Sequence, residues 1–272
     1  AAFSSTGNSD IIFGGTINGA QTLSVTTDGN TTFGGIIGGT NALTSVTTDA
    51  GGTTNLNGGN ISTTGDQSFG DAASLGADAV LTGVNVTFDS TINGNQNLTI
   101  TASGTTTLSG AVGGTSALAS LTSNGGSTTV LNGSTITTTG AQTLTDAVTL
   151  GVDTTLSGTN INFASTVNGS SADTESLTIT GNVDFNGIVG GSTSLEFLTV
   201  SGTTSLDGGN VTTAGIQTFT GATTLGADAT LSGTNVSFVS TLNGAQNLTI
   251  SASGLTSFGS TVGNSAALTS LT

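Results

Sequence analysis

The 272-residue chain contains no lysine, arginine or histidine, and it also lacks cysteine, proline, methionine, tryptophan and tyrosine. Its 15 acidic residues therefore give a formal net charge of -15. Because Lys and Arg contacts to phosphate groups supply most of the affinity for nucleic acids, we expect no nucleic-acid partner. The same argument makes binding to anionic membrane surfaces unfavourable.

Other absences narrow the chemistry and the location of the chain. Without cysteine there are no disulfides and no thiolate metal ligands. No run approaches 18 apolar residues, and residues 1–5 have neither a basic nor an apolar stretch. We therefore expect no membrane insertion, and we expect any secretion signal to have been removed or to lie outside the given sequence. A chain without Lys or Arg offers trypsin-like proteases no cleavage site, which suits a long-lived extracellular material.

The missing residue types also argue against catalysis. Only carboxylates remain as acids or bases, and no cationic side chain is left to stabilise an oxyanion. Glycoside hydrolases need two carboxylates that converge, whereas Glu175 and Glu196 fall in different segments of the sequence. We therefore predict that the chain is not an enzyme, and we assign no catalytic, cofactor-binding or metal-binding residue and no cofactor.

A phrase that begins with Phe and ends in Asn-Gly occurs four times. The interval is 75 positions at each step, which indicates a repeat architecture and not one globular core. We expect a single β-solenoid over 1–272, with a partial repeat at 1–42, repeats at 43–117, 118–194 and 195–267, and the start of another at 268–272. A surface loop is expected near 170–176, where the third copy carries extra residues. The four phrases are Phe13–Gly19, Phe88–Gly94, Phe163–Gly169 and Phe238–Gly244.

Apolar residues alternate with polar ones between the glycines, as in Val84–Phe88 and Asn97–Thr101. A period of two with β-branched and aromatic residues is typical of strands that bury one face. Helices are excluded by the abundance of Gly, Thr and Asn and by the lack of a 3.6-residue period. The sequence therefore predicts an all-β chain.

A shorter period, marked by an apolar residue followed closely by glycine, divides each repeat. It passes through Leu56, Leu75, Ile92, Val112 and Leu131, at steps of 19, 17, 20 and 19 positions. This predicts four coils of about nineteen residues per 75-residue repeat, arranged as a parallel β-helix. Equivalent residues should then stack inside the coils. We expect this of the sets Val86, Ile161, Val236; Phe88, Phe163, Phe238; and Leu81, Leu156, Leu231.

Polar residues also recur every 75 positions. Asp78, Asp153 and Asp228 suggest calcium, but they are four expected coils apart, and Ca²⁺ needs six to eight close oxygens. An Asx turn at a corner is the favoured interpretation. Hydrogen bonds to neighbouring coils are favoured over a glycan contact for the amides, which are Asn85, Asn160, Asn235, Gln67, Gln142 and Gln217.

The many threonines raise the possibility of an ice-binding ladder. Thr99–Thr101 and Thr135–Thr137 have the required Thr-x-Thr form. A ladder needs this form at the same place in consecutive coils, whereas the expected repeat is four coils long. We therefore expect the array to be interrupted, and an ice- or glycan-binding face is kept only as the alternative function.

The chain has a characteristic repeat pattern. It is carried by segments such as Leu75–Ala79 and Leu231–Val236, together with Gly-Asn-x-Thr-rich corners. It resembles the repetitive stalks of large bacterial surface exoproteins, the filamentous-haemagglutinin-like adhesins and β-strand-repeat proteins. The resemblance implies a right-handed parallel β-helix that is secreted to the cell surface and serves as a structural shaft or filament segment. Its expected partners are neighbouring repeats, copies of itself end to end, or surface glycans and matrix.

Overall fold

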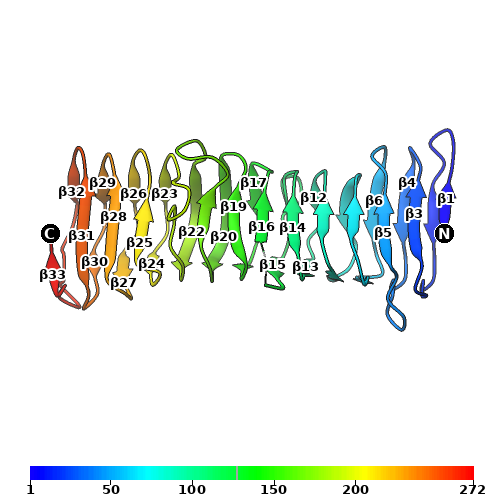
Figure 1. Cartoon of the computed structure of the whole chain (residues 1–272), viewed down its shortest axis with the longest axis horizontal. Helices are drawn as coiled ribbons and strands as arrows, with labels where there is room; N and C mark the ends of the chain where they lie inside the picture. The colour runs from blue at the N-terminus through cyan, green and yellow to red at the C-terminus, as the bar shows by residue number, and fades with distance from the viewer. Residues whose placement is uncertain (127) are drawn as a thin grey trace. The chain divides into compact units, whose positions relative to one another are not determined.

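The computed structural model describes residues 1–126 and 128–272. Within these ranges the regular elements are all β-strands, and their pairs run parallel, stacked in about 13 turns. This confirms the expected all-β parallel β-solenoid (Figure 1). The strands form two compact units, Ala1–Gly140 and Ala141–Thr272, and each unit is described by itself.

The first unit has three sheets, and in several coils a single bridging residue such as Ile37 or Val112 takes the place of a strand. Sheet 1 has the order β1-β3-β5-β8-β11-β14-β16, sheet 2 the order β2-β4-β6-β9-β12, and sheet 3 the order β7-β10-β13-β15. The strands are β1 (Ala2–Ser4), β2 (Ile11–Phe13), β3 (Thr22–Thr26), β4 (Asn30–Phe33), β5 (Ser45–Thr48), β6 (Thr53–Leu56), β7 (Asn60–Ser62), β8 (Gln67–Phe69), β9 (Ala72–Leu75), β10 (Ala79–Gly83), β11 (Val86–Phe88), β12 (Ile92–Asn93), β13 (Asn97–Ala102), β14 (Thr105–Leu108), β15 (Ser120–Asn124), β16 (Thr128–Leu131) and β17 (Thr135–Thr137).

The second unit repeats this arrangement. Strands β20 and β22 are long enough to span two rows. One row runs β20-β22-β23-β26-β29-β32 through their first halves, a second runs β18-β20-β22-β24-β27-β30 through their second halves, and a third runs β25-β28-β31-β33. Its strands are β18 (Gln142–Leu144), β19 (Ala147–Leu150), β20 (Thr154–Phe163), β21 (Val167–Gly169), β22 (Leu177–Phe185), β23 (Leu198–Val200), β24 (Thr204–Leu206), β25 (Asn210–Thr212), β26 (Gln217–Phe219), β27 (Thr223–Leu225), β28 (Ala229–Gly233), β29 (Val236–Phe238), β30 (Leu242–Asn243), β31 (Asn247–Ala252), β32 (Thr256–Phe258) and β33 (Ser270–Leu271).

The core of each unit lies inside the coils. Alternate side chains of most strands point inward, as in β8, β11 and β29, which gives the buried–exposed alternation that the sequence predicts. The nine side chains expected inside are all buried, with no more than 1% of any surface exposed. Several core rings lie parallel to a ring in the next coil, for example Phe69 on Phe88 with centroids 4.7 Å apart.

The coils are less uniform than the expected nineteen residues, and some are longer. Residues that pair across adjacent coils are 213 − 195 = 18 positions apart at Leu195 and Thr213, but 61 − 37 = 24 positions apart at Ile37 and Ile61. Part of the excess comes from loops that leave the coil and return to it, such as residues 38–42, so the length varies without breaking the stack.

The 75-residue repeat does not correspond to four coils, which corrects the prediction from sequence. In the first unit Phe13 pairs with Phe33, Phe33 with Leu56 and Leu56 with Leu75, so three coils take up 75 − 13 = 62 positions. Phe88 lies 88 − 75 = 13 positions further on, after β10 and in β11, which belongs to sheet 1 and not to sheet 2. One repeat therefore spans three and two-thirds coils.

The second unit has the same relationship. Phe163 pairs with Phe185, Phe185 with Leu206 and Leu206 with Leu225. Three coils again take up 225 − 163 = 62 positions. Phe238 lies beyond β28, in β29, and pairs with Phe219 in β26. Equivalent residues of successive repeats thus lie on different faces of the coil. They therefore do not stack on one another, which corrects the stacking predicted from the sequence.

Candidate functional site

The repeated Asn-Gly phrase holds a loop of the next coil in place. Asn93 Oδ1 accepts hydrogen bonds from the backbone N–H groups of Thr115 and Ser116 at 2.9 and 3.2 Å. The N–H of Gly94 donates to the carbonyl oxygen of Ser116 at 3.2 Å. The other three copies form the same three bonds: Asn18 and Gly19 to Thr40 and Asn41, Asn168 and Gly169 to Ser192 and Thr193, and Asn243 and Gly244 to Ser265 and Ala266.

Each of these loops leaves the coil at a glycine with a left-handed backbone. Gly113 has φ 69°, and a Cβ atom there would lie 2.1 Å from the carbonyl oxygen of Thr137. The chain rejoins the sheet at Leu118, which pairs with Thr138 as Val112 pairs with Ile136. The loops expose small Gly, Ser, Thr and Asn side chains at their tips, so they vary the surface without adding charge.

The recurrent glutamines are buried inside the coil corners. Gln217 is fully buried, and its Nε2 donates to the carbonyl oxygen of Ser232 at 2.8 Å, to Thr213 Oγ1 at 3.2 Å and to the carbonyl oxygen of Val211 at 3.3 Å. Gln67 makes the same contacts at one corner of the first unit. These amides join two successive coils, so the predicted structural role is confirmed.

The recurrent aspartates cap strands of the next coil. Asp78 accepts hydrogen bonds from both the backbone and the side-chain N–H groups of Asn97 at 2.9 Å, and Asp228 does the same for Asn247. These bonds, the backbone one foremost, lower the pKa of both carboxyl groups below the usual 3.8. Asp153 accepts from the Ser176 N–H at 2.9 Å. The carboxylates therefore bind across coils, which corrects the expected Asx turns.

The recurrent asparagines also bind the next coil, as the sequence predicts. Asn85 Oδ1 accepts from the backbone N–H of Thr105 at 2.8 Å, and Asn235 Oδ1 accepts from that of Leu255 at 2.7 Å. Asn160, in the copy that carries the extra residues, donates instead to Asp184 Oδ2 at 3.1 Å. These amides align successive coils at their corners.

A buried carboxylate in the first unit was not singled out from the sequence. Asp71 exposes only 2% of its surface, and one oxygen accepts the N–H groups of Gly51 and Gly52, both at 2.7 Å. Its second oxygen accepts from Thr54 Oγ1 at 3.2 Å. An aspartate recurs at the equivalent position of the next repeat, the buried Asp146, and this recurrence is the signal that could have identified the position.

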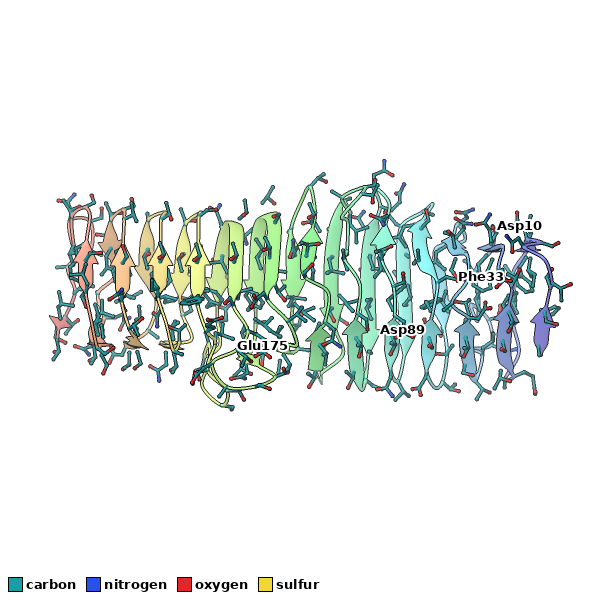
Figure 2. All side chains as sticks on the ribbon, turned by 90° about the horizontal axis from the view of Figure 1, so that it is seen from above. Asp10, Phe33, Asp89 and Glu175 are labelled. Carbon is teal, nitrogen blue, oxygen red and sulfur yellow. The ribbon has the colours of Figure 1, made fainter. Side chains whose placement is uncertain are left out.

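The extra residues of the third copy include an exposed loop. Residues 170–174 are exposed, and the loop projects beside the strands at Glu175 (Figure 2). Glu175 itself is buried: its carboxylate accepts from Ser170 Oγ at 2.6 Å and from the Ser171 N–H at 3.3 Å. Burial opposes ionisation, but these hydrogen bonds and one from Thr174 prevail and lower the pKa of Glu175 below 4.5. The carboxylate thus closes the loop on itself.

The structure brings Glu175 and Glu196 into neighbouring coils, where the Glu196 N–H donates to the carbonyl oxygen of Glu175 at 2.8 Å. Their carboxylates nevertheless have separate partners, since Glu196 accepts from Ser176 Oγ at 3.4 Å. Within residues 1–126 and 128–272, no group of three or more acidic side chains is placed to hold a metal ion. The carboxylates of Asp71, Asp78, Asp153, Asp228, Glu175 and Glu196 accept hydrogen bonds from the protein's own backbone, amide and hydroxyl groups.

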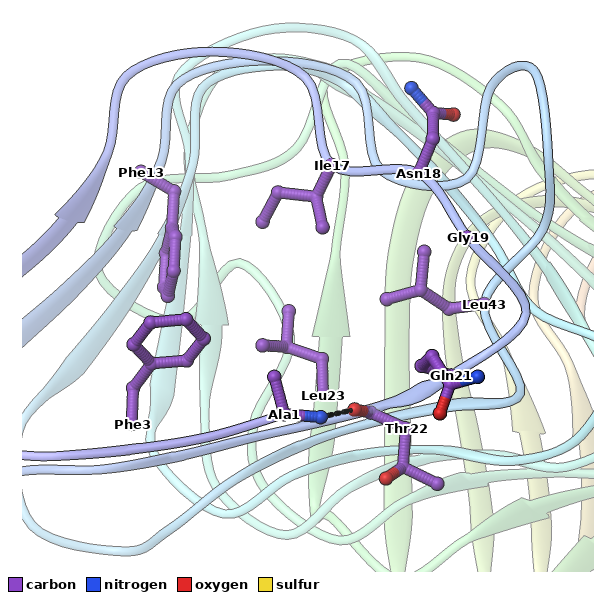
Figure 3. Close-up of a pocket in the computed structure, with 10 residues that line it drawn as sticks. All are labelled: Ala1, Phe3, Phe13, Ile17, Asn18, Gly19, Gln21, Thr22, Leu23 and Leu43. Carbon is purple, nitrogen blue, oxygen red and sulfur yellow. Dashed lines mark hydrogen bonds between the residues drawn. The ribbon is translucent and has the colours of Figure 1, made fainter.

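An apolar hollow of about 260 Å³ lies at the first coil of the first unit (Figure 3). The rings of Phe3 and Phe13 meet edge to face across it, with centroids 5.1 Å apart. Its other apolar walls, Ile17 and Leu23, are also side chains that point into the coil. The polar Asn18 on its rim already holds the loop at Thr40 and Asn41. The hollow is the end of the core, without the convergent polar groups of a ligand site.

Outward-facing hydroxyl groups form ladders along the sheets at a single position of each strand, although the Thr-x-Thr form does not recur in every coil. In the second unit six consecutive coils place Thr or Ser at one position of the paired strands. The hydroxyl groups of Ser237 and Ser257 are hydrogen-bonded at 3.0 Å. Sheet 1 of the first unit has a ladder of five. The two sets are Thr155, Thr178, Thr199, Thr218, Ser237, Ser257 and Ser24, Thr47, Ser68, Thr87, Thr107.

Comparison with protein-family models, with curated proteins and with solved structures finds no match for this chain. Among the residues that the structure describes, no helix is long and apolar enough to cross a membrane. The coil geometry and the hydrogen bonds that polar side chains form between coils are therefore the observations that bear on function.

Proposed function

We propose that this chain is a structural segment of an extracellular bacterial surface protein, a shaft or filament section that is adhesin-like in role. The proposal joins the stalk-like style of the sequence to the parallel β-solenoid of the structure. A solenoid holds its shape through contacts between neighbouring coils, so it can extend by adding repeats. Secretion, the cell-surface location and end-to-end association belong to this proposal.

One observation carries the proposal: the repeat of three and two-thirds coils. Equivalent loops, such as residues 38–42 and 113–117, branch from Ile37 and Val112, which lie in different rows of the coil. Successive repeats therefore present the same features in different directions. A protein that bound one extended ligand would gain from repeats on one face, whereas a shaft gains from an even distribution of loops and corners.

The use of the polar side chains supports the same role. Asn93 binds a loop one coil away, Gln217 joins two coils inside a corner, and Asp78 caps a strand of the next coil. Such contacts align neighbouring coils and are satisfied within the protein. They give the stack rigidity, which is the property that a shaft requires.

The proposal is tested by imaging the purified full chain and its native assembly by electron microscopy, with fibre diffraction of aligned samples. A shaft is expected to give rods or fibres with a meridional repeat of about 4.8 Å along their length. Compact particles without that repeat would contradict the proposal. Surface labelling of cells that produce the protein would test its location, and an exclusively internal signal would count against it.

The hydroxyl ladder supports a second candidate, a face that binds ice or a glycan. The six coils from Thr155 to Ser257 present hydroxyl groups at intervals of one strand spacing, about 4.8 Å. Thermal hysteresis or saturable glycan binding that is lost in Thr199→Lys would favour this function. Thr249→Lys, on the separate row β25-β28-β31, serves as the control. No hysteresis and no glycan binding by the wild type would exclude it.

A further inference from the structure

The chain contains eight Asn-Gly pairs, and the structure places six of them in two distinct settings. Four belong to the repeated phrase that holds loops, and two, Asn57-Gly58 and Asn132-Gly133, follow the ends of β6 and β16. We propose that Asn57 and Asn132 are sites of spontaneous deamidation in the folded protein, whereas the four loop-holding asparagines are protected. The remaining pairs begin at Asn124 and Asn186 and belong to neither group.

The reaction needs only the chain and water. The backbone nitrogen of the glycine attacks Cγ of the preceding asparagine, and a new C–N bond forms as the Cγ–Nδ2 bond breaks. The proton of the glycine N–H leaves with the amide nitrogen as ammonia. Water then opens the resulting five-membered imide to aspartate or isoaspartate. Glycine favours the attack because it has no side chain to hinder the approach.

The loop-holding asparagines are protected by three hydrogen bonds each. At Asn93 the carboxamide oxygen accepts two N–H groups from the loop, and the attacking nitrogen, that of Gly94, donates its proton to Ser116. The carboxamide oxygen stays on Cγ in the imide, so its two bonds act by holding the side chain in place: they must break for Cγ to turn toward the Gly94 nitrogen, which must also release Ser116. The same set at Asn18, Asn168 and Asn243 gives these sites the same protection.

Asn57 and Asn132 lack the two side-chain bonds. Both are exposed, and neither carboxamide has a hydrogen-bond partner among the residues that the structure describes. The following nitrogens, of Gly58 and Gly133, each donate one bond, to the carbonyl oxygens of Phe33 and Leu108 at 2.8 and 3.0 Å. One bond instead of three must therefore open for the reaction to begin.

The product of the reaction fits the fold, because the next repeat already has it. Adding 75 to 57 gives 132, and adding 75 again gives 207, where the chain has Asp207 followed by Gly208. The N–H groups of Asp207 and Gly208 donate to the Phe185 carbonyl oxygen at 2.9 and 2.8 Å, as those of Asn57 and Gly58 do to Phe33. An aspartate at this position is therefore accommodated, and each event adds one negative charge to the protein.

The test is to incubate the folded full chain at mildly alkaline pH and to follow each Asn-Gly site by top-down mass spectrometry. Trypsin mapping is not possible, because the chain has no Lys or Arg. We expect Asn57 and Asn132 to convert at least about tenfold faster than the four loop-holding sites, as the loss of two hydrogen bonds implies. In denaturant, the six sites should react at similar rates.

Equal rates in the folded chain, or faster conversion at the loop-holding sites, would overturn the proposal. Two variants extend the test. Asn57→Gln should abolish conversion at that position alone and leave Asn132 unchanged. The double variant Asn57→Asp, Asn132→Asp should melt at the wild-type temperature; a clear loss of stability would show that the fold does not accept the product.

Discussion

Phe163 stacks on Phe185 in the next coil, with ring centroids 5.3 Å apart and planes 7° from parallel. Phe238, which occupies the equivalent position of the following repeat, stacks instead between Phe219 and Phe258. The two rings that look identical in the sequence therefore belong to different rows of the core. This relationship follows from a repeat of three and two-thirds coils. The register can therefore be tested by mutating these rings.

A double-mutant cycle should detect the stacking partner. Phe163→Leu and Phe185→Leu remove two rings in contact, so their effects on the free energy of unfolding should be coupled by about 0.5–1.5 kcal/mol. Phe163→Leu and Phe238→Leu should be additive within about 0.5 kcal/mol, because those rings lie in different rows. Urea unfolding of the single and double variants with the wild type measures both terms. Coupling of Phe163 to Phe238 and not to Phe185 would contradict the register.

The fold class could be predicted from the sequence, but the coil register could not. Strict alternation around residues such as Val86 and Phe88 indicates inward-facing strands wherever they occur. The register was obscured because buried threonines such as Thr48 and Thr106 take core positions that look polar in the sequence. Loops that add residues to some coils also shift the apparent beat, so an average of nineteen residues concealed a range of lengths.

Removal of a loop-holding asparagine should destabilise the first unit. Asn93→Ala leaves the N–H groups of Thr115 and Ser116 without their acceptor, so we expect a loss of about 1–3 kcal/mol in the free energy of unfolding. The matched control is Asn132→Ala, since Asn132 also precedes glycine but has no side-chain hydrogen bond within the described part of the chain. Its effect should stay below about 0.5 kcal/mol. Similar losses for both variants would refute the loop-holding role.

The buried glutamine should tolerate neither truncation nor charge. Gln217→Ala removes the three hydrogen bonds that Nε2 donates and opens a cavity, which should cost about 2–3 kcal/mol in thermal or urea unfolding. Gln217→Glu should cost more, because a carboxylate would face three oxygen acceptors in a buried site. Gln96→Ala is the control, because Gln96 is only half-buried and its amide donates to the neighbouring Asn95 side chain; it should change stability by less than about 0.5 kcal/mol. A mild effect of Gln217→Glu would argue against the described corner.

Asp71 and Glu175, whose burial the sequence did not reveal, share one physical feature. The partners of each carboxylate come from other segments that the fold brings beside it. Asp71 binds the N–H groups of a corner about twenty positions earlier in the chain. Glu175 is hidden by a loop that sequence comparison identifies only as an insertion. Neither burial could be inferred without the register, because polar residues are ordinarily assigned to the surface. Recurrence in the next repeat was the available signal for Asp71 and was absent for Glu175.

The left-handed glycine at the start of a loop should not accept a side chain. Gly113→Ala would combine a left-handed backbone with a Cβ atom 2.1 Å from the Thr137 carbonyl oxygen, so we expect a loss above about 2 kcal/mol. Gly7 has the same φ of 69°, but a Cβ atom there meets nothing within 4 Å. Gly7→Ala should therefore cost only about 1 kcal/mol, the backbone contribution alone. Thermal unfolding of the pair separates the two effects, and equal losses would contradict the close contact.

The carboxylate of Glu175 should make the loop at 170–174 sensitive to acid. Burial raises the pKa of this group, but hydrogen bonds from Ser170, Thr174 and Ser171 outweigh that effect, so the pKa in the folded protein lies below the ordinary 4.5. The ionised group therefore stabilises the fold at pH values above 4.5, and this contribution is lost as the pH falls below 4.5 through the folded pKa. Glu175→Gln should lower the free energy of unfolding by about 1 kcal/mol at neutral pH. The difference from wild type should shrink in acid, when the wild-type carboxyl is protonated as well.

Asp89→Asn is the matched control. It removes an exposed carboxylate that has no hydrogen bond in the described residues, and it should change stability by less than about 0.5 kcal/mol at neutral pH. A Glu175→Gln effect that stays constant from neutral pH into the acid range would show that the charge does not hold the loop.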